Sequence, residues 1–134
     1  MLLLDAGVWI AAKDRADRFF DPARALVLDP GRPVAALDLT YYEVANVVGA
    51  RWRAPEVARG LARTISARCG GQVATVDAGL LELALELLGR HGLTAYDAAY
   101  VAVAEQQGWT LVSTDVADLV SKGLAVTPDR AGYP

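Results

Sequence analysis

Residues 93–115 read LTAYDAAYVAVAEQQGWTLVSTD, and this stretch contains a helix, a stop signal and a strand in succession. Thr94 and Asp97 fit a capping box, in which a hydroxyl caps the helix start and the acid reaches back, so a helix is expected to begin here. Gly108 is expected to end that helix. Residues 109–113 then alternate apolar and polar side chains, which predicts a β-strand directly after the helix.

The rest of the chain repeats this alternation of strand and helix. Strands are expected at residues 2–4, 34–39, 73–76, 109–113 and 124–127. Helices are expected at residues 20–28, 41–53, 55–68, 80–88, 95–107 and 116–122. Strands separated by helices predict a three-layer α/β/α fold with a mainly parallel central sheet. Because no repeat or long linker divides residues 1–134, we expect a single domain.

Composition excludes several classes of protein. Hydrophobic residues make up 54% of the chain and charged residues 22%, which excludes intrinsic disorder. Cys69 is the only cysteine and His91 the only histidine, so an internal disulfide and a structural zinc site are excluded. No charge-free apolar run approaches the ~18 residues of a membrane span, and the N-terminus lacks a signal-peptide pattern. A cytoplasmic protein is therefore expected.

Charge is distributed unevenly around a net value of −3. Residues 51–68 contain five arginines against Glu56 alone, whereas residues 77–129 contain eight acids against Arg90 and Lys122. A basic segment can contact phosphate, but the acidic half would repel phosphate unless cations intervene.

Four acidic residues occupy similar positions around the predicted strands. Asp5 ends the first strand, and Glu43 opens the helix that follows the second strand. Asp97 opens the helix after Thr94, and Asp115 ends the fourth strand, with Asp118 three residues later. In a parallel sheet the carboxyl ends of the strands open onto one edge, so these side chains are expected to meet there.

Each of these acids, taken alone, also has a purely structural explanation. Residues 40–43 and 94–97 both fit a capping box, and Asp5 and Asp115 fit helix N-caps. Taken together, carboxylates crowded at one edge would repel one another unless cations neutralise them. Hard oxygen ligands favour Mg²⁺ or Mn²⁺, which points to phosphoryl chemistry with a metal-activated water.

Four segments in this order resemble the PIN domain family, with VapC-type toxins of toxin–antitoxin pairs as the nearest match. They are LLLDAGVWI at 2–10, EVAN at 43–46, LTAYDAAY at 93–100 and LVSTD at 111–115. The resemblance implies a Mg²⁺- or Mn²⁺-dependent endoribonuclease that leaves 5′-phosphate ends, inhibited by a cognate antitoxin and assembled as a homodimer. A non-catalytic PIN-like module that binds RNA or protein is the alternative.

The resemblance also assigns roles to individual residues. It implies a catalytic, metal-binding quartet of Asp5, Glu43, Asp97 and Asp115. Asp118 corresponds to an additional acid found in some members, and Asn46 to a polar residue that orients the glutamate. One departure is Gly7, because the family often has Ser or Thr there. Glycine at this position also argues against a phosphatase of the Asp-x-Asp type. The chain also lacks the acidic pair and the strand-end lysine that a signalling receiver domain requires.

Several further side chains have open interpretations. Ser113 and Thr114 either hydrogen-bond a metal-bound water or phosphate, or act only as caps. Tyr100 is expected in the core, and Tyr96 either lies at the surface or touches substrate. Candidate contacts to RNA or to a protein partner lie in the basic segment, where a solvated helix surface is the simpler interpretation: Arg51, Trp52, Arg53, Arg59 and Arg63.

Overall fold

The central sheet has four parallel strands in the order β3-β2-β1-β4. The computed structural model describes residues 1–132. Its elements are β1 (Leu2–Leu4), α1 (Ala6–Ala11), α2 (Phe20–Leu28), β2 (Val34–Leu37), α3 (Asp38–Val44), the π-helix η1 (Ala45–Arg51), α4 (Pro55–Cys69), β3 (Val73–Ala74), α5 (Ala78–His91), α6 (Ala95–Gln107), β4 (Thr110–Val112), the π-helix η2 (Val116–Val120) and the 3₁₀-helix η3 (Pro128–Arg130). The predicted mainly parallel sheet is confirmed.

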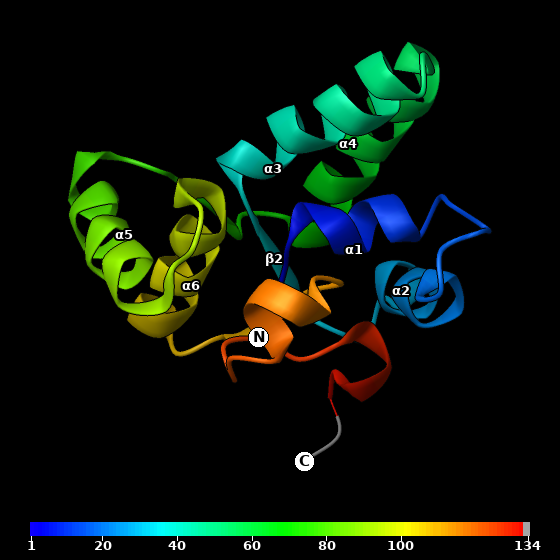
Figure 1. Ribbon diagram of the computed structural model, residues 1–134. Helices are drawn as coiled ribbons and strands as arrows, with labels where there is room; N and C mark the ends of the chain where they lie inside the picture. The colour runs from blue at the N-terminus through cyan, green and yellow to red at the C-terminus, as the bar shows by residue number, and fades with distance from the viewer. Residues whose placement is uncertain (133–134) are drawn as a thin grey trace.

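Alternating strand residues divide the core into two halves, one on each face of the sheet. Leu3 of β1 packs with α5 and α6, whereas Leu4 packs with α1, α2 and α4. Figure 1 shows α5 and α6 on one side of the sheet and α1, α2 and α4 on the other. Because side chains alternate between the faces of a strand, β1 contributes to both hydrophobic layers. The expected three-layer architecture is confirmed.

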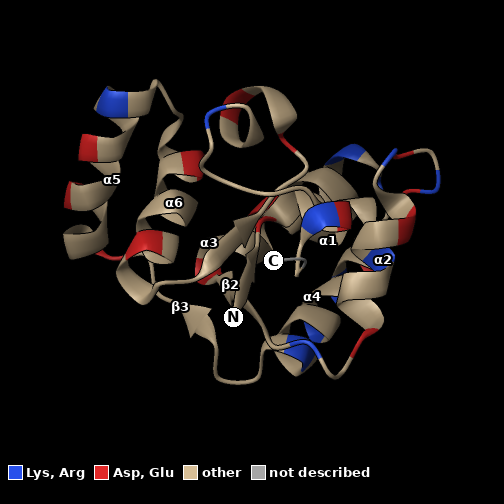
Figure 2. Ribbon diagram, turned by 90° about the horizontal axis from the view of Figure 1, so that it is seen from below, with Lys and Arg blue, Asp and Glu red and all other residues tan. Residues whose placement is uncertain are grey.

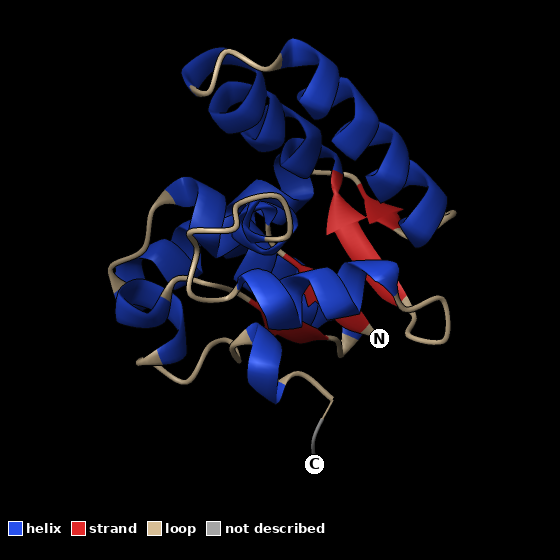
Figure 3. Ribbon diagram, turned by 90° about the vertical axis from the view of Figure 1, so that its right-hand side faces the viewer, coloured by secondary structure: helices blue, strands red, loops and turns tan. Residues whose placement is uncertain are grey.

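A helical hairpin made of α3, η1 and α4 extends away from the sheet (Figure 3). Its turn contains Trp52 and Arg53, and Arg53 has a φ of 56°, in the left-handed region that few non-glycine residues adopt. Pro55 occupies the first turn of α4, where its missing N–H leaves no hydrogen bond unmade. The turn of the hairpin and α4 therefore carry the basic segment, residues 51–68.

The structure corrects the expected boundaries in the first half of the chain. Helix α1 was not expected; it begins immediately after Asp5 and is too short for a periodic apolar pattern to reveal it. Strand β2 ends at Leu37 rather than at residue 39, and the next helix begins at Asp38 rather than at residue 41. The single helix expected at 41–53 is an α-helix that continues as a π-helix.

Two expected strands are shorter than the sequence indicates. Strand β3 covers only two residues, and the segment 124–127 makes a single bridge, between Val126 and Val112 of β4, instead of a strand. Gly123, with a φ of 73°, and Pro128 bound this segment closely, which limits the length that can pair. Across residues 1–132, the helices are too short or too polar for any of them to cross a bilayer.

Candidate active site

Asp5 combines a capping role with a position at the centre of the candidate site. It follows β1 directly, its own N–H donates to the Val112 carbonyl at 3.1 Å, and its Oδ1 accepts from the Val8 N–H at 3.2 Å. Only 8% of the residue is exposed. The predicted N-cap is therefore present, and the cap holds a charged group inside the protein.

The surroundings of Asp5 disfavour its ionised form. Burial raises the pKa of Asp5 from 3.8 to about 7, although its hydrogen bonds with Ser113 and the Val8 N–H lower the pKa. The negative charges of Glu43 and Asp97 make a smaller contribution to this rise. Asp5 at the end of β1, Glu43 on α3 and Asp97 on α6 thus lie within electrostatic reach of one another.

Glu43 is held by a chain of buried hydroxyl groups. The Tyr100 hydroxyl donates to Glu43 Oε1 at 2.9 Å and lies 2.7 Å from Thr40 Oγ1, which accepts from the Leu37 N–H at 3.1 Å. Because the single Tyr100 proton is donated to Glu43, the Thr40 hydroxyl is the donor to the Tyr100 oxygen. Burial raises the pKa of Glu43, the Tyr100 hydrogen bond lowers it, and Asp97 raises it.

This hydroxyl chain changes two expectations from the sequence. Thr40 is not an N-cap, because α3 begins two residues earlier, and Glu43 lies in the last turn of the helix rather than at its start. Tyr100 is buried as expected, but its hydroxyl is directed at Glu43. Its spacing of three residues from Asp97 on α6 is the signal that could have revealed it. Within residues 1–132, Asn46 makes no hydrogen bond to Glu43 and is exposed.

Asp97 links the two sides of the site. Its N–H donates to Thr94 Oγ1 at 3.2 Å, so the predicted N-cap of α6 is confirmed. Burial raises the pKa of Asp97, and the charges of Asp115 and Asp118 raise it further. Since Asp97 also raises the pKa of both Asp5 and Glu43, it interacts with every other acid of the candidate set.

The segment after β4 places the remaining candidates. Ser113 is fully buried, accepts a hydrogen bond from the Asp115 N–H at 2.9 Å, and is a hydrogen-bond partner of Asp5. Asp115 caps the following π-helix by accepting from the Asp118 N–H at 2.9 Å, and Asp118 is exposed. Ser113 therefore connects two of the predicted site acids through one hydroxyl.

Gly7 leaves a space that the Thr114 side chain occupies. A Cβ atom at residue 7 would lie 2.5 Å from Thr114 Oγ1 and 3.2 Å from Asp5 Oδ1. Both distances are shorter than ordinary carbon–oxygen contacts, so even alanine would displace Thr114. A hydroxyl group thus lies beside Asp5 despite the glycine, and it is supplied by the segment after β4 instead of by residue 7.

The donor set fits a hard divalent cation in its chemistry. It consists of carboxylate and hydroxyl oxygens, and Gly7 keeps bulk away from Asp5 Oδ1. Burial is the largest cause of the raised pKa of Asp5, Glu43 and Asp97, and neighbouring negative charges add to it; a bound cation would relieve that repulsion. In the part of the chain from 1 to 132, however, no three His, Cys, Asp or Glu side chains converge tightly enough to form a complete metal cage.

The arginine-rich segment lies apart from these carboxylates. Arg59 forms an exposed ion pair with Glu56, and the other candidate contacts are exposed near the hairpin turn or along α4: Arg51, Trp52, Arg53 and Arg63. Arg68 instead donates to backbone carbonyls of Val27 and Leu26 and has a structural role. Figure 2 shows basic positions towards α2 and α4, and acidic ones along α5 and α6.

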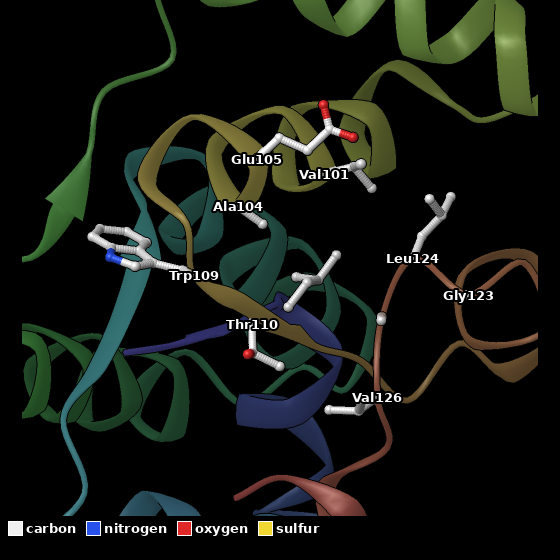
Figure 4. Close-up of a pocket in the computed structure, with 10 residues that line it drawn as sticks. Val101, Ala104, Glu105, Trp109, Thr110, Gly123, Leu124 and Val126 are labelled. Atoms are coloured by element: carbon white, nitrogen blue, oxygen red, sulfur yellow. The ribbon is translucent and has the colours of Figure 1, made fainter. Parts of the chain in front are cut away.

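Two cavities of about 290 Å³ differ in their relation to the site. One lies beside Glu43, and its walls come from α3, η1 and α6: Leu39, Tyr42, Glu43, Asn46, Val47 and Tyr96. The other lies between α6, β4 and residues 123–126 (Figure 4), and none of the candidate acids lines it. In that cavity the side chains are mainly aliphatic, and the Trp109 ring points away from Leu124.

The chain is similar in sequence to one protein family and in fold to several solved structures. The model of the PIN domain family matches residues 2–118. PAE2754 from Pyrobaculum aerophilum is 26% identical over 96% of this chain and 83% of its own, with a TM-score of 0.71. VapC20 from Mycobacterium tuberculosis, described as a sarcin–ricin loop cleaving toxin, is 21% identical over 100% and 97%, with a TM-score of 0.68.

A toxin–antitoxin complex from Klebsiella pneumoniae contains a chain that is 20% identical, over 96% of this chain and 98% of that one, with a TM-score of 0.70. No curated protein matches the sequence. The likeness to VapC20 and to the Klebsiella chain shows a shared fold, and the family model covers most of the sequence. This chain belongs to the PIN domain family.

Proposed function

We propose that this chain is a divalent-metal-dependent endoribonuclease and the toxin of a type II toxin–antitoxin pair. The observation that carries the proposal is the position of Asp5, Glu43 and Asp97, which come from three separate elements and lie within electrostatic reach of one another. Helix caps need no such convergence, whereas a cation site does. Membership of the PIN domain family and the description of VapC20 as a sarcin–ricin loop cleaving toxin support the same function.

Asp5, Glu43 and Asp97, with Asp115, are the residues that would hold Mg²⁺ or Mn²⁺; Asp118 lies further out. When bound, such a cation polarises the phosphodiester and lowers the pKa of water. The protein's own contribution is orientation. Tyr100 fixes one oxygen of Glu43, and Ser113 connects Asp5 to the Asp115 backbone. We infer that Asn46 and Thr114 contribute polar contacts around these carboxylates.

The hairpin is the proposed contact surface for RNA and for the antitoxin. Arginines on α4 offer charge to phosphate groups, and Trp52, 37% exposed at the turn, is the proposed anchor for a protein partner. The Klebsiella neighbour is described as a toxin–antitoxin complex, which supports a protein inhibitor of this kind. We further propose a homodimer of single-domain chains spanning residues 1–134, acting in the cytoplasm.

Cleavage of RNA by the purified protein tests the proposed chemistry. With Mn²⁺ it should cut RNA internally and leave 5′-phosphate and 3′-hydroxyl ends, because water attacks phosphorus, the 3′-oxygen leaves and the 2′-hydroxyl is not used. Asp5→Asn, Asp97→Asn and Glu43→Gln should each lower kcat/KM by on the order of 10²-fold or more. Asp118→Asn, a charge change at an exposed position, is the matched control and should lose much less.

Three results would contradict the proposal. Cleavage that persists undiminished in EDTA would show that the carboxylates are caps and not metal ligands. Cyclic 2′,3′-phosphate ends would show acid–base chemistry at the 2′-hydroxyl. If the protein binds RNA or a protein partner but does not cleave RNA with any divalent cation, it is the non-catalytic PIN-like module.

A further inference from the structure

We propose that the cavity beside Glu43 binds an unpaired base of the RNA, stacked against the rings of Tyr42 and Tyr96. This inference rests on the proposed ribonuclease function and adds a property to it. The RNA strand must be single-stranded next to the cleaved bond, because a base held in a duplex cannot enter a side pocket.

Two exposed aromatic rings from distant parts of the chain line this cavity. Tyr42 on α3 is 75% exposed and Tyr96 in the first turn of α6 is 58% exposed. Within residues 1–132, neither hydroxyl group hydrogen-bonds to another residue. By contrast, the buried Tyr100 and the half-buried Tyr41 both bond through their hydroxyls. The fold therefore leaves the rings of Tyr42 and Tyr96 available at a cavity that Glu43 also lines.

The other walls match the two kinds of surface that a base presents. Leu39 and Val47 supply apolar contacts for its faces, and the exposed Asn46 amide has donors and an acceptor for its polar edge. Stacking on aromatic rings is the usual way in which proteins hold unpaired bases. A cavity of about 290 Å³ has room for one base.

The cavity adjoins the candidate metal ligands, and this determines which part of the RNA can reach it. Glu43 lines the cavity and is also one of the candidate metal ligands, so a phosphate at the carboxylates brings an adjacent nucleotide to Tyr42 and Tyr96. An arginine side chain of a protein partner is the competing occupant. The geometry favours a base, because the cavity lining includes an amide with both donors and an acceptor, which the edge of a base can pair with and a guanidinium, which only donates, cannot fully use.

A comparison of intact and abasic RNA tests the proposal through cleavage. Short single-stranded RNAs, each lacking one base next to the cut bond, are cleaved by the wild type and by Tyr42→Ala and Tyr96→Ala. We expect loss of the contacted base to raise KM by about tenfold in the wild type, with little change in kcat. Each alanine variant should raise KM similarly on intact RNA, and base removal should then add little.

Conservative variants separate stacking from the hydroxyl groups and from general damage. Tyr42→Phe and Tyr96→Phe keep the rings and should restore wild-type KM. Leu85→Ala, which removes a 50% exposed apolar side chain from α5, should leave KM unchanged. Strictly additive effects of base and ring removal, or alanine variants that cleave intact RNA like the wild type, would overturn the proposal.

A binding assay without cleavage separates this inference from the proposed enzyme function. In an Asp97→Asn background, a single-stranded RNA with one 2-aminopurine should lose fluorescence on binding, because stacking quenches that base. The loss should disappear in Tyr42→Ala and Tyr96→Ala. Tyrosine-dependent quenching without any cleavage by the wild type would refute the nuclease and retain the base site. Cleavage with unaltered binding in both variants would refute the base site alone and indicate a protein side chain as the occupant.

Discussion

Replacing Asp5 by asparagine should stabilise the protein in the absence of divalent cations. Folding raises the pKa of Asp5 from 3.8 to about 7, so the folded state binds this proton more tightly than the unfolded state. The contribution of Asp5 to stability is fully present below pH 3.8 and is lost progressively as the pH rises through about 7. At pH 8 the loss is about 4 kcal/mol, because one pKa unit corresponds to about 1.4 kcal/mol.

Asparagine removes the buried charge and keeps the cap. Its side-chain oxygen can accept the Val8 N–H as Asp5 Oδ1 does, and asparagine caps helices as well as aspartate does. Asp5→Asn should therefore gain about 4 kcal/mol in free energy of unfolding at about pH 8. At about pH 5.5, where the folded wild type holds the proton, the gain should be about 2 kcal/mol smaller.

Urea unfolding in EDTA at these two pH values measures the difference. Asp77→Asn is the matched control, because Asp77 is exposed and caps α5 through the same bond, from the Leu80 N–H at 2.9 Å. That variant should change stability little at either pH. Equal gains for Asp5→Asn at both pH values, or a gain no larger than that of Asp77→Asn, would refute the role of burial and of the neighbouring acids.

Further predictions concern the neighbours of the carboxylates and the basic hairpin. Tyr100→Phe removes the hydrogen bond to Glu43 and should lower both kcat and Mn²⁺ affinity, measured by electron paramagnetic resonance, by about tenfold; unchanged Mn²⁺ affinity would refute a positioning role. Gly7→Ser should cost about 1–3 kcal/mol in urea unfolding, and adding Thr114→Ala should restore most of it, because the two side chains compete for one space. Arg63→Ala should reduce the slope of log binding constant against log salt concentration by about the amount expected for one phosphate contact. An unchanged slope would show that RNA does not contact Arg63.

The sequence predicts the positions of the acids because strand ends and helix starts have local sequence patterns. Asp5 and Asp97 lie where a strand ends or a helix begins, and parallel strands bring such positions to one edge whatever the detailed packing. The caps of α1 and α6 agree with the local pattern for the same reason. The dual role of Asp5 shows that a capping explanation and a site explanation do not exclude each other.

Other features depend on contacts between distant segments, which the sequence pattern does not encode. The Tyr100 hydroxyl reaches Glu43 across 57 positions, and this depends on how α6 packs near α3. The contact of Gly7 with Thr114 likewise requires the turn after β4 to lie beside α1. The last expected strand has a suitable apolar pattern, yet only Val126 forms a bridge, because strand length depends on the partner and on the flanking turns.

Stabilisation of the folded protein by Mn²⁺ tests most directly whether the carboxylates form one cation site. A ligand that binds only the folded state adds about 2.7 kcal/mol at 100 times its Kd. Thermal unfolding should therefore show this gain for the wild type and for the control Asp77→Asn, and no gain for Asp97→Asn, which removes the acid that interacts with all the others. An equal response to Mn²⁺ in the wild type and in Asp97→Asn would contradict a shared site.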